Sequence, residues 1–129
     1  MISGTWYTEI DLDGNATGKD SIVLKQYGHK VIGKSYFSIV GENGEIDTKV
    51  YEVCGVVKND FFCAYWIDSS RRQKGIGAFT YRIEEDGRVL NGHGTYYDEI
   101  DNQLKHGDYK LFLNDFSTRH RQGKVWSDY

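Results

Sequence analysis

Four aromatic residues and one basic loop carry the side chains best suited to bind a ligand. The rings belong to Tyr51, Trp66, Tyr96 and Tyr109. The basic loop is the segment Asp68–Gly75, which reads DSSRRQKG. Aromatic faces stack on flat rings such as nucleobases, and guanidinium groups match the oxygens of a phosphate. We therefore predict that these residues bind a small nucleotide-like anion, provided that the fold brings them together.

The loop supplies three cations, and two hydroxyls elsewhere could orient the ligand. Arg71, Arg72 and Lys74 would hold phosphate, while Thr8 and Ser35 would offer hydrogen bonds within apolar walls. The alternative is a solvated charged loop without a ligand role, because nearby acidic residues would repel phosphate. These acidic residues are Asp11, Asp13, Glu42, Glu45, Asp98, Glu99 and Asp101. Both interpretations stay open at this point.

The sequence shows no pattern typical of catalysis, a metal site or a cofactor. The histidines His29, His93, His106 and His120 lie on separate segments without paired ligand spacing. No residue supplies an oriented base for Cys63, so we expect this cysteine to be a small buried residue in a strand. A glycine-rich phosphate loop and a Gly-x-Ser-x-Gly motif are both missing. We predict a protein that is not an enzyme and that needs no metal and no cofactor.

The composition indicates one soluble domain. The chain has 129 residues, of which 39% are hydrophobic, enough for a single core. The net charge of −3 argues against a binder of duplex nucleic acid, which would carry a dominant basic face. No signal peptide is recognisable, no apolar run approaches the roughly 20 residues of a spanning helix, and the cysteines fit no disulfide framework. We expect a cytoplasmic protein, or the soluble part of an inner-membrane protein whose transmembrane segment lies outside this chain.

Short β-rich runs separated by turn residues predict an all-β fold. The predicted strands are Thr5–Ile10, Ser21–Tyr27, Val31–Phe37, Val50–Val57, Phe61–Ile67, Gly77–Ile83, Val89–Tyr97 and Gly107–Leu113. Tight turns at Gly28-His29, Asn59-Asp60 and Asp86-Gly87 alternate with longer connections. The longer connections are Asp11–Asp20, Ser38–Lys49, Asp68–Ile76 and Asp98–His106. We predict an eight-stranded antiparallel up-and-down barrel over residues 1–113, with the long loops at one end, followed by a C-terminal tail over 114–129.

The last tight turn sets the register of the two strands that flank it. Tyr81 then faces Gly92 and Phe79 faces Gly94, so we expect the glycines to make room for two inward rings. The same alternation places Trp6 inside the barrel near the tight turns. Near the long-loop end it places these residues inside: Thr8, Ser35, Phe37, Tyr51, Trp66, Phe79, Tyr96 and Tyr109. The rings either contact a ligand or fill the interior by contacting each other, since a barrel of this size permits both.

Two parts of the chain resemble known families. The motif Gly4-Thr5-Trp6 ahead of an eight-strand meander resembles the calycin-type barrels, the lipocalin and avidin group of ligand binders. The second half is similar to the β-barrel sensor domain of small membrane effectors in bacterial CBASS-type antiphage systems. This similarity is carried by Gly77-Ala-Phe79, Glu85-Asp-Gly-Arg-Val-Leu90, Gly92-x-Gly-Thr-Tyr96 and Gly107-x-Tyr109. In that family the barrel recognises a cyclic nucleotide and two transmembrane helices carry out the response, so the resemblance implies a sensor of a cyclic di- or oligonucleotide in antiviral defence.

Two other functions stay open. A barrel with a filled interior could form a homo-oligomer or dock a partner protein through exposed tyrosines. The tyrosines expected on the outer surface are Tyr7, Tyr27, Tyr36, Tyr65 and Tyr97. A barrel of the lipocalin kind would instead bind a small apolar ligand deep inside.

Overall fold

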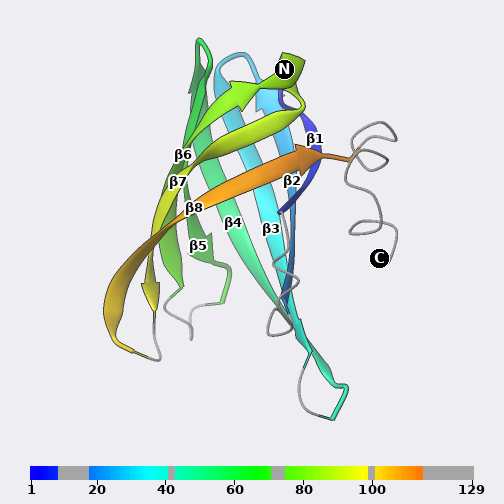
Figure 1. The fold of residues 1–129 in the computed structure, drawn as a ribbon, viewed down its shortest axis with the longest axis vertical. Coiled ribbons are helices and arrows are strands. Elements are labelled where there is room, and N and C mark those ends of the chain that lie inside the picture. Colours follow the sequence, from blue (N-terminus) through cyan, green and yellow to red (C-terminus); the bar gives the residue numbers. More distant parts are fainter. Residues whose placement is uncertain (9–17, 41–42, 71–74, 99–100, 115–129) are drawn as a thin grey trace.

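The computed structural model shows a closed antiparallel barrel of eight strands (Figure 1). It describes residues 1–8, 18–40, 43–70, 75–98 and 101–114. The strands are β1 (Gly4–Thr8), β2 (Gly18–Tyr27), β3 (Lys30–Val40), β4 (Ile46–Lys58), β5 (Phe61–Asp68), β6 (Ile76–Glu84), β7 (Val89–Asp98) and β8 (Gln103–Leu113). Each strand pairs with the next one along the chain, and β8 pairs with β1. The predicted all-β meander barrel is confirmed.

Three tight connections lie at one end of the barrel. Gly28 and Asn59 take positive φ values of 63° and 54° there, a conformation that both residue types tolerate. The third connection differs from the predicted two-residue turn, because a 3₁₀ turn, η1 (Glu85–Gly87), joins β6 to β7. The first residue pair after this turn is Glu84 with Val89, so the pairing downstream is the predicted one.

Strands β3, β4 and β8 are longer than the sequence indicated. The β3–β4 hairpin reaches beyond the other strands at the open end, where Ser38 pairs with Thr48 and their hydroxyls lie 3.0 Å apart (Figure 1). Strand β8 begins at Gln103, which pairs with Asp98. The predicted loops 38–49 and 98–106 were therefore too long. Most of their residues are polar, and they lack the apolar alternation by which a half-buried strand is recognised.

The core fills the half of the barrel nearest the tight turns. Trp6 is fully buried there as predicted, and its indole Nε1–H donates to the carbonyl of Ile2 over 3.0 Å. The other side chains that are less than 2% exposed are Ile2, Leu24, Val31, Val53, Phe62, Leu90 and Leu111. Most of them alternate with outward-facing residues along their strands, which is how a narrow barrel buries one face of its sheet.

The predicted role of Gly92 is wrong, and that of Gly94 is partly right. A Cβ on Gly92 would lie 2.0 Å from the carbonyl oxygen of Thr80 and 2.6 Å from the Cα of Tyr81. Gly92 therefore permits two backbones to approach closely, as a sharply coiled barrel requires, and does not accommodate a ring. A Cβ on Gly94 would lie 3.3 Å from the ring of Tyr109, so Gly94 does face a ring, supplied by β8.

The prediction that Cys63 is buried is also wrong. Burial alternates along β5, so that Phe62 and Ala64 point into the core while Cys63 and Tyr65 point outward and are exposed. Both cysteines, Cys54 and Cys63, are free thiols.

Several predicted features lie outside the described residues. These are residues 115–129 of the tail and the loop cations Arg71, Arg72 and Lys74. The first residue of the tail, Asn114, is described, and its N–H donates to the carbonyl of Thr5 over 2.7 Å. Across the described ranges, no helix has the length and apolar character needed to cross a membrane.

Candidate ligand-binding cavity

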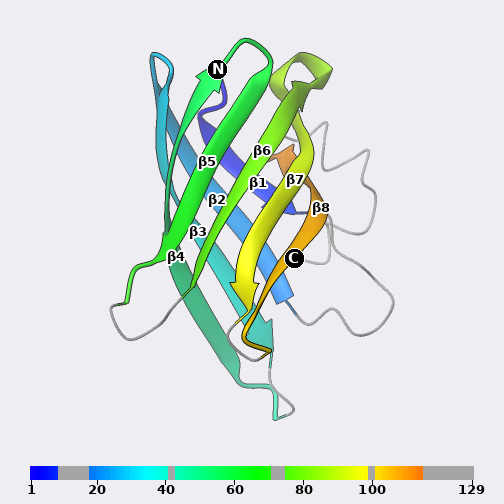
Figure 2. The same cartoon turned by 90° about the vertical axis from the view of Figure 1, so that its left-hand side faces the viewer.

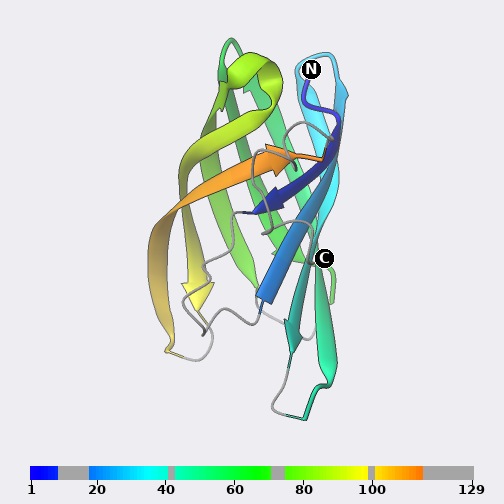
Figure 3. The same cartoon turned by 45° about the vertical axis from the view of Figure 1, so that its right-hand side comes forward.

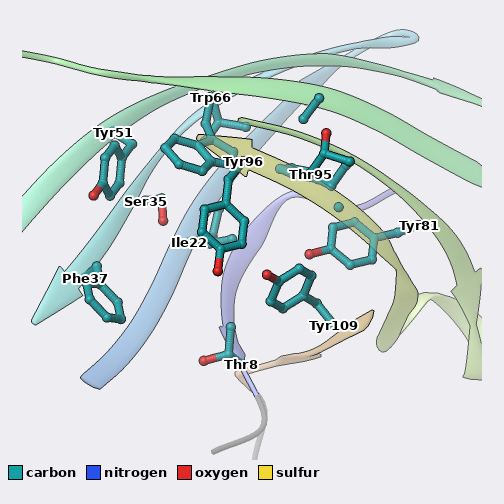
Figure 4. Close-up of a pocket in the computed structure, with 14 residues that line it drawn as sticks. Thr8, Ile22, Ser35, Phe37, Tyr51, Trp66, Tyr81, Thr95, Tyr96 and Tyr109 are labelled. Carbon is teal, nitrogen blue, oxygen red and sulfur yellow. The ribbon is translucent and has the colours of Figure 1, made fainter. Parts of the chain in front are cut away.

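The half of the barrel away from the tight turns encloses a cavity of about 350 Å³ (Figure 4). It is lined by Thr8, Ile22, Ser35, Phe37, Tyr51, Val53, Trp66, Ala78, Phe79, Tyr81, Gly94, Thr95, Tyr96 and Tyr109. All the residues that the sequence placed inside at this end are among them. The fold thus brings together six of the predicted binding residues, whose role toward a ligand remains a prediction. Thr95 is exposed and alternates with Gly94 and Tyr96 along its strand, and it also borders the cavity.

Within the described residues, β1 borders only a short part of β8. Pairing between β1 and β8 consists of three residue pairs, the last of which joins Thr8 to Leu111 (Figure 3). Tyr109 lies on β8 beyond that last pair. It occupies an inward position and lines the cavity, and it is 37% exposed.

Two rings on one wall of the cavity are held in place by glycines and by each other. A Cβ on Gly77 would lie 2.4 Å from the indole of Trp66, and one on Gly75 would lie 2.9 Å from the ring of Tyr51. The two rings meet edge to face, with centroids 4.7 Å apart and an interplanar angle of 62°. This role of Gly75 and Gly77 was not predicted from the sequence. The pairing of Trp66 with Gly77 across β5 and β6 is the signal that could have revealed it.

The lining residues combine aromatic surface with hydroxyl groups. Figure 4 shows the hydroxyls of Tyr81, Tyr96 and Tyr109 directed toward the middle of the cavity, with Thr8 and Ser35 at its edge. A hydroxyl can both donate and accept a hydrogen bond. None of the lining residues in the described ranges is charged. This environment suits a flat, neutral, polar ring better than a charged group.

One rim cation, Lys105, is held by two carboxylates. Its Nζ lies 2.6 Å from Asp98 Oδ2 and also contacts Asp101 Oδ2. The hydrogen bond to Asp101, followed by that to Asp98, raises the pKa of Lys105. The positive charge is thereby compensated, so this lysine adds little attraction for an anion. The sequence analysis recognised both aspartates as a repulsive influence but missed the lysine that neutralises part of it.

A second cation at the rim of the cavity is Lys49. It was not recognised as a candidate because residues 38–49 were predicted to form a loop. It lies on β4 and pairs with Phe37, a lining residue, so both occupy the cavity face of their strands. Lys49 is exposed. Of the basic residues in the described ranges, it is therefore well placed to reach an anionic group at the mouth.

The described residues on either side of the basic loop bring its two ends together at the rim. The N–H of Asp68 donates to the carbonyl of Gly75 over 2.8 Å, and Asp68 pairs with the lining residue Tyr51. Asp68 Oδ1 also accepts the N–H of Ser70 at 2.8 Å. The segment that contains Arg71, Arg72 and Lys74 therefore begins and ends beside the cavity, while the predicted phosphate role of these cations remains untested.

The tyrosines predicted on the outer surface are exposed in two of five cases. Tyr27 is 61% exposed and Tyr65 is 52% exposed. Tyr7, Tyr36 and Tyr97 also occupy outward positions but are half-buried, so their predicted exposure is only partly right. Tyr7 packs against Val89 and Phe112, and the Tyr97 hydroxyl donates to Asn102 Oδ1 over 2.7 Å. Cross-strand neighbours cover these rings, which alternation alone does not predict.

Neither a metal site nor a known family helps to assign the cavity. Within the described ranges, no group of three or more His, Cys, Asp or Glu side chains could hold a metal ion. No protein-family model matches the chain, and a search of curated proteins finds no significant match. The function of the cavity must therefore be argued from its own geometry and chemistry.

Proposed function

We propose that this barrel is a non-enzymatic, cytoplasmic sensor that binds a cyclic di- or oligonucleotide messenger in bacterial antiphage defence. The supporting observation is the cavity lined by Trp66, Tyr96 and Tyr109, whose described lining residues are all uncharged. Stacking on aromatic rings holds unpaired bases, and hydroxyls at the edge can pair with base heteroatoms. The resemblance to CBASS-type sensor barrels favours a cyclic nucleotide among base-bearing ligands.

The size of the cavity sets how such a ligand would bind. A volume of about 350 Å³ is near the lower limit of small-molecule sites, which span roughly 300–1,000 Å³. We expect one base to enter the cavity between the rings. The sugar–phosphate ring and any further base would stay at the mouth, where the ends of the basic loop and Lys49 lie.

The phosphates would meet cations on one side of the mouth. Arg71, Arg72 and Lys74 belong to the loop that begins beside Tyr51, and Lys49 lies two residues before Tyr51 on the same strand β4. Arginine pairs with phosphate through two parallel hydrogen bonds and lysine through a compact charge. These contacts outside the cavity leave its uncharged interior free for the base.

A thermal-shift panel tests this function. Cyclic dinucleotides, their linear counterparts, mononucleotides and inorganic phosphate are added to the protein, and the Tm is measured at increasing concentration. A ligand of the folded state stabilises it by about 2.7 kcal/mol at a hundredfold excess over Kd. We expect a saturable rise in Tm with at least one cyclic dinucleotide and a smaller rise with its linear form. An unchanged Tm with every nucleotide at millimolar concentration would contradict the proposal.

A second candidate ligand is a small apolar molecule. It is favoured by the apolar part of the wall, to which Ile22, Phe37, Val53 and Phe79 contribute. In that case a fluorescent fatty-acid analogue would become brighter on mixing with the protein, and nucleotides would not displace it.

A further inference from the structure

The outer face of strands β3 to β6 exposes an extensive apolar surface. Its large members are Ile32, Val56, Phe61, Tyr65, Ile67 and Ile76, each between 38% and 52% exposed. We refer to these six residues together as the outer apolar face. Figure 2 shows β4, β5 and β6 side by side on one face of the barrel. Scattered exposed hydrophobic residues are normal, but a contiguous group of this kind marks an interaction surface.

The pairing register shows that the group is contiguous. Ile32 pairs with Cys54, and Cys54 pairs with Tyr65 on the next strand. In the neighbouring row toward the open end, Ile67 pairs with Ile76. Directly paired residues share a face of the sheet with Cβ atoms about 5 Å apart. The apolar side chains therefore form adjoining rows across four strands. The Tyr65 hydroxyl is held against the thiol of Cys54, whose hydrogen bond raises the pKa of Tyr65.

The corresponding outer positions of β7 and β8 are mostly polar. They are occupied by Asn91, His93, Thr95, His106, Asp108 and Lys110. His93 Nδ1 lies 2.6 Å from Asp108 Oδ1, as expected for side chains that face solvent. Leu104 is an isolated large apolar residue on this side and is 82% exposed. The apolar character thus belongs to one side of the barrel and is not a general property of its surface.

We propose that the outer apolar face is the interface of a symmetric dimer of this chain. The six large side chains present an apolar area on the order of 500 Å². Cys54, Cys63 and Ala78 lie between them, and the aliphatic stems of Lys58 and Arg82 border them. With them the face is on the order of 600 Å², the lower end of the area per partner that a specific interface buries.

The closed barrel explains why a second copy fits this surface. Every strand pairs with a neighbour on each side, and the outer surface of β3 to β6 is a sheet face whose strands are paired with one another. A sheet face without a groove is matched by another sheet face, and two sheets of equal twist pack with their strands about 30° apart. Two identical copies satisfy this requirement through one two-fold axis, the commonest symmetry of soluble oligomers.

We expect an antiparallel arrangement of the two barrels because of the cations at one end of the face; at the other end Lys34 pairs with Glu52 in the row of Ile67, so a cation and an anion lie side by side there. Lys58 and Arg82 flank Phe61 near the tight turns, and the guanidinium of Arg82 lies 5.4 Å from the centre of the Phe61 ring. Parallel barrels would bring these cations together across the interface. Antiparallel barrels keep them at opposite ends, and both cavity mouths remain accessible. The dimer is independent of the proposed ligand and is expected in the ligand-free protein.

Sedimentation equilibrium of the ligand-free protein over micromolar concentrations tests the dimer. We expect the wild-type mass to rise with concentration from 14.9 kDa toward twice that value. Tyr65→Lys and Ile76→Lys place a charge in the interface and should remain monomeric. Leu104→Lys makes the same kind of change on the opposite side and should dimerise like the wild type. All three sites are exposed, so each variant should keep the wild-type Tm measured at a dilution where all are monomeric.

Thiol labelling provides a second measurement on the unmodified chain. Cys63 is exposed within the face, so its reaction with a maleimide should slow as the protein concentration rises. A wild-type protein that stays monomeric throughout this concentration range would overturn the proposal. The outer apolar face would then have to bind a partner other than a second copy of this chain. Dimers of Tyr65→Lys and Ile76→Lys as stable as the wild-type dimer would also overturn it.

Discussion

Gly92→Ala is expected to lower the free energy of unfolding by about 3–5 kcal/mol and the Tm by on the order of 15 °C. The added Cβ would lie 2.0 Å from the carbonyl oxygen of Thr80 and 2.6 Å from the Cα of Tyr81. Both atoms belong to backbone that is paired within the sheet, so neither can move without disturbing the pairing of β6 with β7. Thermal and denaturant unfolding followed by circular dichroism measure the effect.

Gly107→Ala is the matched control for this substitution. Gly107 also faces inward, but its added Cβ would meet the ring of Tyr109, at 3.2 Å from the hydroxyl oxygen. A side-chain ring at an open cavity can shift, and alanine reduces the entropy of the unfolded chain. We expect a change within about 1 kcal/mol. Equal stability of the two variants would show that β6 and β7 do not approach as closely as described.

Trp66→Ala is expected to weaken binding of the cyclic nucleotide roughly 5- to 150-fold, because a base–aromatic stack contributes about 1–3 kcal/mol. Calorimetric titration measures the loss. Trp66 also contacts Tyr51 and lies against Gly77, so the variant should be less stable. The titration is therefore performed well below its Tm.

Filling the cavity provides the complementary experiment. Ser35→Phe places a ring among the lining residues and should abolish binding while the barrel still folds. Ser38→Phe introduces the same ring on the same strand at an outward position and should bind as the wild type does. Unchanged affinity in both Ser35→Phe and Trp66→Ala would place the ligand outside the cavity.

The fold was predictable because two independent patterns agree on the same register. Tight turns at Gly28 and Asn59 and the alternation of apolar residues specify the strand pairs that the structure contains. The third turn shows that the pairing of two strands can stay as predicted even when the turn between them is of a different type. The 3₁₀ turn Glu85–Gly87 replaced a simple hairpin turn and left Ile83 opposite Leu90 as expected.

The cavity residues were also predictable, because inward positions follow from register. Features that depend on distances across the barrel were not. The close approach at Gly92 arises from strand coiling, and the placement of Trp66 against Gly77 depends on side-chain rotation. Cys63 was misjudged because residue type was given more weight than alternation. The engagement of Lys105 by Asp98 and Asp101 depends on a hairpin that the sequence did not distinguish from a loop.

The placement of a base among the cavity rings is most directly measured by nuclear Overhauser effects between ligand and protein. A cyclic dinucleotide carrying isotope-labelled bases is added to the protein, and contacts from base protons to ring protons are recorded. We predict contacts from one base to the rings of Trp66 and Tyr96, which line the cavity. Contacts confined to residues outside the cavity, or no contacts at saturating ligand, would contradict the proposal that the open half of the barrel receives a base.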